Sequence, residues 1–391
     1  MKKIVMVAAA VHPVPPRKGA AVEWWMYQVC RRLAGFEPHI VSIAAEGYAD
    51  EERRDGIAFH RIRTGRLYRR VFQKILGVDP YSYARRVARR LDVIRPDIVH
   101  VHNAPALFAE LARRYRGPAR WILHMHNEMP LERLPPGAVL FTVSRYLKEW
   151  YGVRLPGADI RIITNGVDTE VFHPLSATEV APLRERLKLT TDKKIILYAG
   201  RVSPEKGPLD LLNAFREQLK QRQDVFLLLI GELRAWGPEG DRRADYGRRV
   251  LEICEVLGNH CYHAGVVNPA NMHQYYPLAD LVVVPSEFEE PFGMVAIEAM
   301  SCGTPVLATR RGGLPEIITN DVTGFLLDDA KDYAAFASRL NELLDGPARL
   351  EGVSRTARTY VEQRHDWNMV TQQLESLYDR LLERHPLNTP A

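Results

Sequence analysis

Short runs of apolar, mostly β-branched residues recur along this chain, and segments with a helical pattern separate them. The runs in the first half are Ile4–Val7, His39–Ile43, Ile98–His102, Trp121–His124 and Val139–Val143. Those in the second half are Lys194–Tyr198, Val225–Ile230, Cys261–Ala264, Leu281–Val284 and Pro305–Ala308. Short runs without polar alternation are typical of strands buried on both faces of a parallel sheet. The alternation of strands and helices therefore predicts an α/β fold with doubly wound parallel sheets.

The predicted helices fill the gaps between these strands. They cover residues 23–33, 80–94, 107–114, 207–222, 242–257, 269–277, 294–301, 331–345 and 367–384. A chain of 391 residues is too long for one ordinary core, so we expect two Rossmann-like domains. Asn165-Gly166, followed by Pro174 and a polar stretch, marks the boundary, and the domains are 1–170 and 171–366. In such sheets ligands bind beyond the carboxyl ends of the strands, and two facing domains would form a deep cleft.

The N-terminus and the cysteines indicate the compartment. Lys2 and Lys3 before the apolar Ile4–Val11 are compatible with a signal peptide, but the run is short and a buried first strand fits better. No run approaches the roughly 20 apolar residues that span a bilayer. The cysteines lack Cys-x-x-Cys spacing, which suggests neither a disulfide framework nor a zinc site; they are Cys30, Cys254, Cys261 and Cys302. We expect a cytoplasmic protein.

Positive charge is concentrated in the first half of the chain. Residues 1–160 hold 27 Lys and Arg against 15 Asp and Glu, and the remainder holds 26 against 33. The basic residues gather in Arg66–Lys74 and Arg85–Arg90. Ordinary amphipathic helices with a solvated face explain this pattern, and so does weak peripheral contact with anionic lipid or an acidic acceptor. Nucleic-acid binding is not expected, because aromatic stacking motifs are missing.

A loop with two cations follows the predicted strand Lys194–Tyr198. It reads Gly200-Arg201-Val202-Ser203-Pro204-Glu205-Lys206-Gly207 and leads into a helix. A strand end that meets a helix N-terminus offers backbone N–H groups to an anion, and Arg and Lys both bind phosphate. By itself this pattern fits a solvated helix-capping turn equally well.

A second loop carries two carboxylates at a fixed spacing. Glu290-Pro291-Phe292-Gly293 follows the strand Leu281–Val284, and Glu298 comes after seven intervening residues, on the next helix. One carboxylate can meet a sugar hydroxyl while the other accepts both hydroxyls of a ribose. The N–H groups of Phe292 to Val295 at the helix start suit a diphosphate or sugar hydroxyls. Two unrelated surface carboxylates would not explain the Pro-Phe-Gly between them.

These segments together resemble a known family. The motifs are Glu290 to Glu298, Gly303-Thr-Pro-Val, Gly312-Gly-Leu-Pro-Glu316, Asn165-Gly-Val-Asp168 with Phe172, and Gly200-Arg201 through Lys206-Gly207. In this order they are similar to the retaining GT-B glycosyltransferases of the group 1 family, family 4 type. The resemblance covers nearly the whole chain. It implies that the last helix, about 367–384, crosses back to pack on the first domain.

The resemblance also implies roles for individual residues. Arg201 and Lys206 would hold the donor diphosphate and stabilise the leaving nucleotide, as a metal does in other transferases. Glu298 would bind the ribose and Glu290 the transferred sugar, with Gly200 beside the phosphates and Gly231 near the nucleobase. This fits the lack of an Asp-x-Asp metal motif, since Asp328-Asp329 precede a helix that they would cap. No cofactor is implied.

Two segments of the first half complete the predicted site. Gly19 and Ala20 follow the first strand, where similar proteins carry Gly-Gly, and their amides would lie near the donor phosphates. His126 and His124 end another predicted strand, and His126 resembles the active-site histidine of the family, which contacts the transferred sugar. His100 and His102 lie on the neighbouring strand and would also line the cleft. A metal site built from the four histidines is a minor alternative, because no carboxylate pattern accompanies them.

The implied function is transfer of a sugar, with retention and without metal, from a nucleotide-diphosphate donor. A UDP-sugar is the favoured donor, and the acceptor is a glycan, a lipid-linked sugar or a small molecule, as in polysaccharide biosynthesis of the cell envelope. A sugar-nucleotide epimerase and a non-catalytic coat or binding protein of the same fold are the alternatives.

Overall fold

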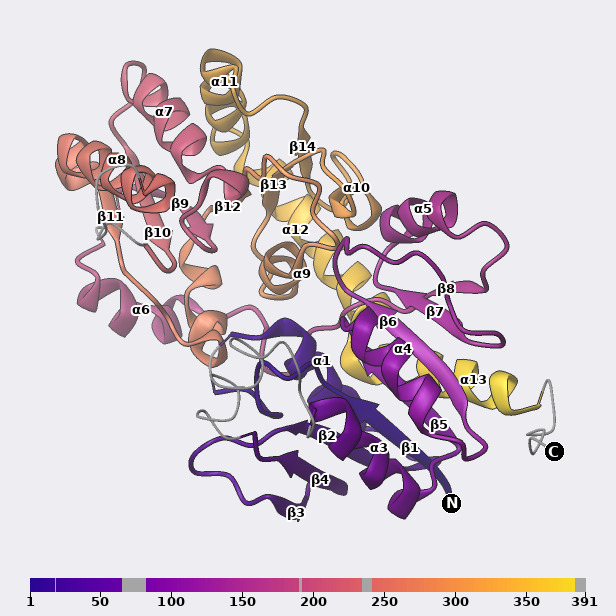
Figure 1. Ribbon diagram of the computed structural model, residues 1–391. Helices are drawn as coiled ribbons and strands as arrows, with labels where there is room; N and C mark the ends of the chain where they lie inside the picture. The colour runs from indigo at the N-terminus through magenta and orange to yellow at the C-terminus, as the bar shows by residue number, and fades with distance from the viewer. Residues whose placement is uncertain (18, 65–81, 190–191, 234–240, 384–391) are drawn as a thin grey trace. The chain divides into compact units, whose positions relative to one another are not determined.

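The computed structural model describes residues 1–17, 19–64, 82–189, 192–233 and 241–383, and it divides into two compact units (Figure 1). The first unit comprises Met1–Asn165 and Trp367–Ala391, and the second comprises Gly166–Asp366. The chain therefore leaves the first unit at Asn165, a few residues before the predicted boundary at 170, and returns to it at Trp367.

The first unit is built on a sheet of eight strands within the described residues. They are β1 (Lys2–Val7), β2 (Phe36–Ile43), β3 (Glu51–Arg54), β4 (Ile57–Ile62), β5 (Ile98–His102), β6 (Arg120–Met125), β7 (Val139–Thr142) and β8 (Ile160–Ile162). Their order is β3-β4-β2-β1-β5-β6-β7-β8, and only the β3–β4 pair is antiparallel. The apolar N-terminal run is thus a central strand, as predicted, and it pairs with β2 and β5.

Helices pack on both faces of this sheet. The first-unit helices are α1 (Ala21–Cys30), α3 (Tyr83–Ile94), α4 (Pro105–Arg114), α5 (Arg145–Arg154) and α13 (Trp367–Glu383). The helices α1 and α13 contact each other and share one core with Ile4 and Met6 of β1. The fully buried Val5 and Val7 point to the opposite face, where α3 and α4 contact each other and lie against β4, β5 and β6.

The second unit has a wholly parallel sheet of six strands in its described part. They are β9 (Lys194–Ala199), β10 (Val225–Ile230), β11 (Cys261–His263), β12 (Leu281–Val284), β13 (Val306–Thr309) and β14 (Phe325–Leu327). Their order is β11-β10-β9-β12-β13-β14. The helices are α6 (Ala177–Arg186), α7 (Pro208–Leu219), α8 (Arg242–Leu257), α9 (Met294–Ser301), α10 (Leu314–Ile317), α11 (Tyr333–Leu344) and α12 (Pro347–Arg364).

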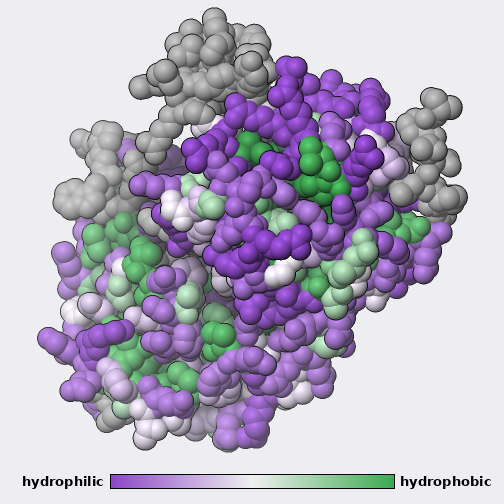
Figure 2. Space-filling model, turned by 90° about the horizontal axis from the view of Figure 1, so that it is seen from below, coloured by the Kyte–Doolittle hydropathy of each residue, from purple (hydrophilic) through white to green (hydrophobic). Residues whose placement is uncertain are grey.

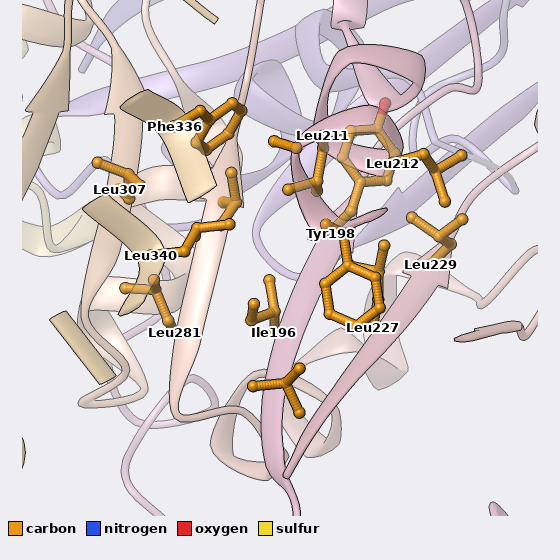
Figure 3. Close-up of a cluster of buried hydrophobic side chains, with 14 of the residues drawn as sticks. Ile196, Tyr198, Leu211, Leu212, Leu227, Leu229, Leu281, Leu307, Phe336 and Leu340 are labelled. Atoms are coloured by element: carbon orange, nitrogen blue, oxygen red, sulfur yellow. The ribbon is translucent and has the colours of Figure 1, made fainter. Parts of the chain in front are cut away.

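The core of the second unit lies between its sheet and the helices α7 and α11 (Figure 3). Ile196 and Tyr198 of β9 lie beside Leu211 of α7, and Phe336 of α11 lies above the neighbouring strands. The alternate residues of β9, such as Leu197, are also fully buried, so helices cover the other face as well. This arrangement confirms the predicted doubly wound α/β fold.

Three expectations about local structure need correction. Residues 269–277 form two 3₁₀ segments, Pro269–Gln274 and Tyr276–Leu278, rather than one helix, because Pro277 removes a backbone donor. The α11 cap is Asp332, whose side chain accepts from Ala335 N, and not Asp328-Asp329. The strand pattern also misses four short strands, β3, β4, β8 and β14, and the helix pattern misses α5, α6, α10 and α12.

Hydrophilic residues cover most of the face in Figure 2, and hydrophobic residues form smaller groups between them. Among the described residues no helix is long and apolar enough to cross a bilayer. The predicted basic helix at 85–90 is the exposed side of α3, where Arg85 and Arg89 face solvent. The other basic segment, Arg66–Lys74, lies outside the described residues.

Candidate functional site

The loop after β9 contacts the loop after β12 through a glycine. After Gly200 the chain makes a 3₁₀ turn at Pro204–Lys206, and Gly207 then starts α7 with φ of 67°. A Cβ at Gly207 would lie 1.9 Å from the Pro285 carbonyl oxygen. Only glycine allows both this left-handed backbone and this contact, so Gly207 brings Lys206 against the carboxylate loop.

Lys206 and Glu290 form a compact polar cluster with Ser286. The Lys206 Nζ lies 2.6 Å from Glu290 Oε1, and the Ser286 hydroxyl donates to the same oxygen at 2.5 Å. The ammonium also lies over the Phe288 ring, 4.5 Å from its centroid. Glu290 is only 6% exposed, and a carboxylate this buried requires such partners. Two residues that the sequence assigned separately, one to the diphosphate and one to the sugar, are therefore in direct contact.

The backbone of Glu290 is fixed by the Gly312-Gly313 turn. Gly313 N–H donates to the Glu290 carbonyl at 2.7 Å. Gly312 has φ of 54°, and a Cβ there would lie 2.2 Å from the Glu290 carbonyl oxygen. The Gly312-Gly313 motif thus positions Glu290 of the Glu290-Pro-Phe-Gly motif.

The helix α9 begins directly after this loop. Gly293 is its N-cap residue, and the first N–H groups of an α-helix, here those of Met294 and Val295, have no intrahelical acceptor. Together with the helix dipole they favour an anion at this end. The buried Phe292 packs beside His365, with ring centroids 5.5 Å apart, and holds the start of the helix in place.

Glu298 lies one turn inside α9 and has a different environment. The Tyr276 hydroxyl donates to its Oε2 at 2.7 Å. Burial raises the pKa of Glu298 to about 7, and the hydrogen bond from Tyr276 opposes that rise. Glu298 can therefore change charge near neutral pH.

Arg201 lies at the end of β9 and is the most accessible of these groups. Its side chain is 62% exposed, and its Nη2 is 3.8 Å from Glu205 Oε1. Its backbone is held, because the Tyr198 hydroxyl donates to the Arg201 carbonyl at 2.6 Å. Gly231, at the end of β10, approaches Gly200 so closely that a Cβ would lie 1.7 Å from the Gly200 carbonyl oxygen.

The structure thus brings the predicted second-unit residues to one edge of the sheet. Arg201 and Lys206 follow β9, Gly231 follows β10, and Glu290 and the start of α9 follow β12. These three strands are neighbours, and their carboxyl ends meet at the same edge. Two cations and free helical N–H groups beside two carboxylates can bind a diphosphate together with sugar hydroxyls.

In the first unit, His126 lies just beyond the end of β6 and is buried. Its backbone N–H donates to Asn103 Oδ1 at 3.2 Å, and its Nε2 lies 3.3 Å from His102 Nδ1. Burial lowers the pKa of His126 to about 3, against an opposing hydrogen bond with Asn165. His126 is consequently a neutral imidazole at physiological pH.

The other three histidines form a stack inside the first unit. His100, His102 and His124 are fully buried, and their pKa values are well below the usual value because burial disfavours the charge. The His100 Nδ1 lies 2.6 Å from the Tyr378 hydroxyl of α13, so this histidine anchors the returning helix. The expectation that His100 and His102 line a cleft is wrong.

The stacked rings do not fit a metal ion. The ligand atoms of His100, His102 and His124 lie within 4.8 Å of one another. However, the His100 ring is stacked on His102 and on His124, with interplanar angles of 25° and 18°. A metal binds imidazole nitrogen in the plane of the ring, and nearly parallel stacked rings cannot direct two lone pairs at one point.

Gly19 and Ala20 lie at the start of α1. Gly19 is exposed, and Ala20 is the N-cap residue with extended backbone and no side-chain cap. The Ala20 carbonyl accepts from Trp24 N at 2.9 Å, as in a regular first turn. The first N–H groups of α1, next to Gly19 and Ala20, are therefore without intrahelical acceptors, which suits an anion.

Sequence reasoning missed four residues that position the predicted ones. They are Ser286 and Phe288 beside Lys206 and Glu290, Tyr276 on Glu298, and Asn103 on His126. Ser286 and Phe288 lie within the recognised loop, so a search for partners of the buried carboxylate could have found them. Tyr276 comes from a 3₁₀ turn far from any motif, and nothing in the sequence marks it.

Comparisons with known proteins identify the family. Residues 180–360 match the family model described as glycosyl transferases group 1, and residues 22–171 match glycosyltransferase family 4. The chain is 33% identical over 380 residues to the lipopolysaccharide 1,2-N-acetylglucosaminetransferase of Salmonella typhimurium, covering 96% of this chain and 97% of that protein. The chain belongs to the family 4 glycosyltransferases. The family assigned from the sequence is confirmed, and the protein is a glycosyltransferase.

Two further relatives extend this result. Spore coat protein SA of Bacillus subtilis is 27% identical over 394 residues, which covers 97% of this chain and 99% of that protein. The structure of Anabaena HepE in complex with UDP and glucose matches with a TM-score of 0.75 and 19% identity, covering 96% of this chain and 99% of that one. The latter match shows that this glycosyltransferase has the GT-B fold.

The environment of Glu298 predicts a pH-dependent stability. Because the pKa of about 7 in the folded state exceeds the ordinary glutamate pKa of 4.5, the folded state binds the proton more tightly than the unfolded state. The free energy of unfolding should therefore fall as pH rises from about 5 to 8. Because the Glu298 side chain is partly exposed, solvent screens part of this effect. We therefore expect the free energy of unfolding to decrease by about 1–3 kcal/mol, less than for a completely buried carboxyl.

Urea denaturation of Glu298→Gln between pH 5 and 8 measures this contribution. The variant keeps an acceptor for Tyr276 and should lack the decrease seen in the wild type. Glu351→Gln, an exposed carboxyl on α12, is the matched control and should behave as the wild type. Identical pH profiles for wild type and Glu298→Gln would contradict the assignment.

Proposed function

We propose that this glycosyltransferase moves a sugar from a UDP-sugar to a glycan or lipid-linked acceptor, with retention of configuration and without a metal. The observation that carries the proposal is the contact of Lys206 with the buried Glu290 in the loop before α9, at the sheet edge where Arg201 also lies. The UDP and glucose of the HepE complex support this donor class. The acceptor class is supported by the Salmonella relative, whose name places it on lipopolysaccharide.

In the proposed donor complex, cations and helix N–H groups bind the diphosphate. Arg201 and Lys206, with the first N–H groups of α9, neutralise the charge that develops on the leaving nucleotide, which is the task of a metal in other transferases. Glu298 accepts hydrogen bonds from the ribose hydroxyls, and Gly231 lies beside the nucleobase. Glu290 accepts from a hydroxyl of the transferred sugar.

The proposed transfer takes place on one face of the sugar. The bond between the anomeric carbon and the phosphate oxygen breaks, and a bond from the same face to the acceptor oxygen forms. The acceptor proton passes to a donor phosphate oxygen. His126 contributes from the first unit as a neutral hydrogen-bonding group at the transferred sugar, and the amides of Gly19 and Ala20 contact donor phosphate.

The non-catalytic alternative has one supporting observation, the similarity to spore coat protein SA. A coat or binding protein of this kind would bind nucleotide without turnover. An epimerase would instead convert the donor in the absence of any acceptor. Both alternatives therefore differ from the proposal in measurable products.

The decisive experiment combines binding with product analysis. Calorimetry with UDP, GDP and ADP should show tightest binding of UDP, and an acceptor screen with UDP-sugars should yield a glycoside. NMR of the new anomeric centre should show the configuration of the donor, and EDTA should leave the rate unchanged. An inverted product would refute retention, and a rate lost to EDTA and restored by Mg²⁺ or Mn²⁺ would refute metal independence. No binding of any nucleoside diphosphate would refute the function.

Removal of either phosphate-binding cation should reduce catalysis. Arg201→Ala and Lys206→Ala each remove a charge-assisted contact worth about 1.5–3 kcal/mol, so we expect kcat/KM to fall about 10- to 150-fold. Arg201→Ala is the cleaner variant, since Lys206→Ala also leaves the buried Glu290 without its ammonium. Arg216→Ala, an exposed arginine on α7, is the control. Wild-type kcat/KM in the Arg201 variant would exclude its role.

We also propose weak peripheral contact of the basic α3 surface with anionic membranes. Arg85 and Arg89 are exposed there, and each basic residue contributes about 1 kcal/mol near anionic lipid. Co-sedimentation should show binding to phosphatidylglycerol vesicles in preference to phosphatidylcholine, weakened in the Arg85→Glu/Arg89→Glu variant and at high salt. Equal binding to both lipids would refute the contact.

A further inference from the structure

Two cysteines that the proposed reaction does not use face each other at the edge of the second unit. Cys254 lies in the last turn of α8, and Cys261 is the first residue of β11, the edge strand of the sheet. Their Sγ atoms are 3.5 Å apart, and both thiols are free. Only Gly258–His260, a single 3₁₀ turn, connects the two elements.

The two Sγ atoms are close enough for a small local movement to bring them to the length of a disulfide bond. A disulfide has its sulfurs about 2.05 Å apart, so the two Sγ atoms need to approach by only about 1.5 Å. Cys254 is partly exposed and accessible to small molecules, whereas Cys261 is buried behind it. The other two thiols are buried and far along the chain: Cys30 contacts Met6, and Cys302 contacts the His273 carbonyl.

The two thiols of the pair are not equivalent. The Cys261 S–H donates to the Cys254 sulfur, and this hydrogen bond lowers the pKa of the Cys254 thiol, while it raises that of Cys261. Burial raises the pKa of Cys30 and Cys302. Because the thiolate is the reactive form, Cys254 should react first among the four.

We propose that Cys254 and Cys261 are a peroxide-responsive redox site, with Cys254 as the attacking thiol and Cys261 as the resolving thiol. The Cys254 thiolate attacks one oxygen of hydrogen peroxide, the O–O bond breaks, and hydroxide leaves, which yields the sulfenic acid. The Cys261 sulfur then attacks the Cys254 sulfur, the S–O bond breaks, and water leaves with the Cys261 proton. Two thiols are oxidised to one disulfide, and the peroxide is reduced to two waters.

The sequence makes the product easy to map. Cleavage after glutamate places every cysteine in a different peptide: 24–37 for Cys30, 253–255 for Cys254, 256–287 for Cys261 and 299–316 for Cys302. The full-length protein is treated with hydrogen peroxide, its free thiols are alkylated in denaturant, and the digest is analysed by mass spectrometry. We expect peptide 253–255 linked to 256–287, reversal by dithiothreitol, and unmodified Cys30 and Cys302 at the same dose.

Two variants distinguish the attacking thiol from the resolving one. In Cys261→Ser the sulfenic acid on Cys254 cannot be resolved and should be trapped by dimedone, whereas in Cys254→Ser Cys261 should take up little dimedone. Circular dichroism checks that both variants are folded, and the wild-type mapping does not depend on them. Sulfinic acid on Cys254 without the link, a link to another cysteine, or equal labelling of both variants would overturn the proposal.

Discussion

The candidate donor site depends on the contact between Lys206 and the buried Glu290. A carboxylate that is 6% exposed is costly unless it is paired, and here an ammonium and a hydroxyl share one of its oxygens. This contact requires the backbones of the loops after β9 and β12 to come into van der Waals contact. Gly207 allows the loop after β9 to approach the loop after β12, and Gly312 allows the loop after β13 to pack on the backbone of Glu290. These glycines thus permit the backbone approaches that bring the ammonium to the carboxylate and hold the Glu290 backbone.

The two carboxylates of the site, Glu290 and Glu298, have different hydrogen-bonding partners and therefore different electrostatic environments. The Lys206 ammonium lies 2.6 Å from Glu290, whereas Glu298 accepts from the neutral Tyr276 hydroxyl, and burial raises the pKa of Glu298 to about 7. A ribose offers hydroxyl donors, and these would stabilise the ionised form of Glu298. In the proposed donor complex, nucleotide binding and deprotonation of Glu298 would therefore favour each other, and the affinity for the donor would depend on pH.

Much of the fold could be predicted, because the local signals agree with the tertiary structure. The helices at 242–257 and 294–301 and the strands at 225–230 and 281–284 have the predicted bounds, since their apolar patterns match what the core buries. The helix α6 contains Pro182, and β3 is an exposed antiparallel strand rich in charge, so neither gives a clear pattern. In the site, motifs marked Lys206 and Glu290, but Tyr276 comes from a distant turn that only the tertiary fold brings to Glu298.

The environment of His126 bears on how the proposed transfer can dispose of the acceptor proton. His126 is the first-unit residue for which the family resemblance implies contact with the transferred sugar, and burial lowers its pKa to about 3. An imidazole whose conjugate acid is this strong is a poor base at neutral pH. His126 can donate or accept a hydrogen bond and can position a hydroxyl, but it is unsuited to hold the proton. In the proposed transfer, a donor phosphate oxygen is the better acceptor for this proton. The phosphate leaves from the same face of the sugar that the acceptor oxygen attacks, so the two oxygens are close when the proton moves.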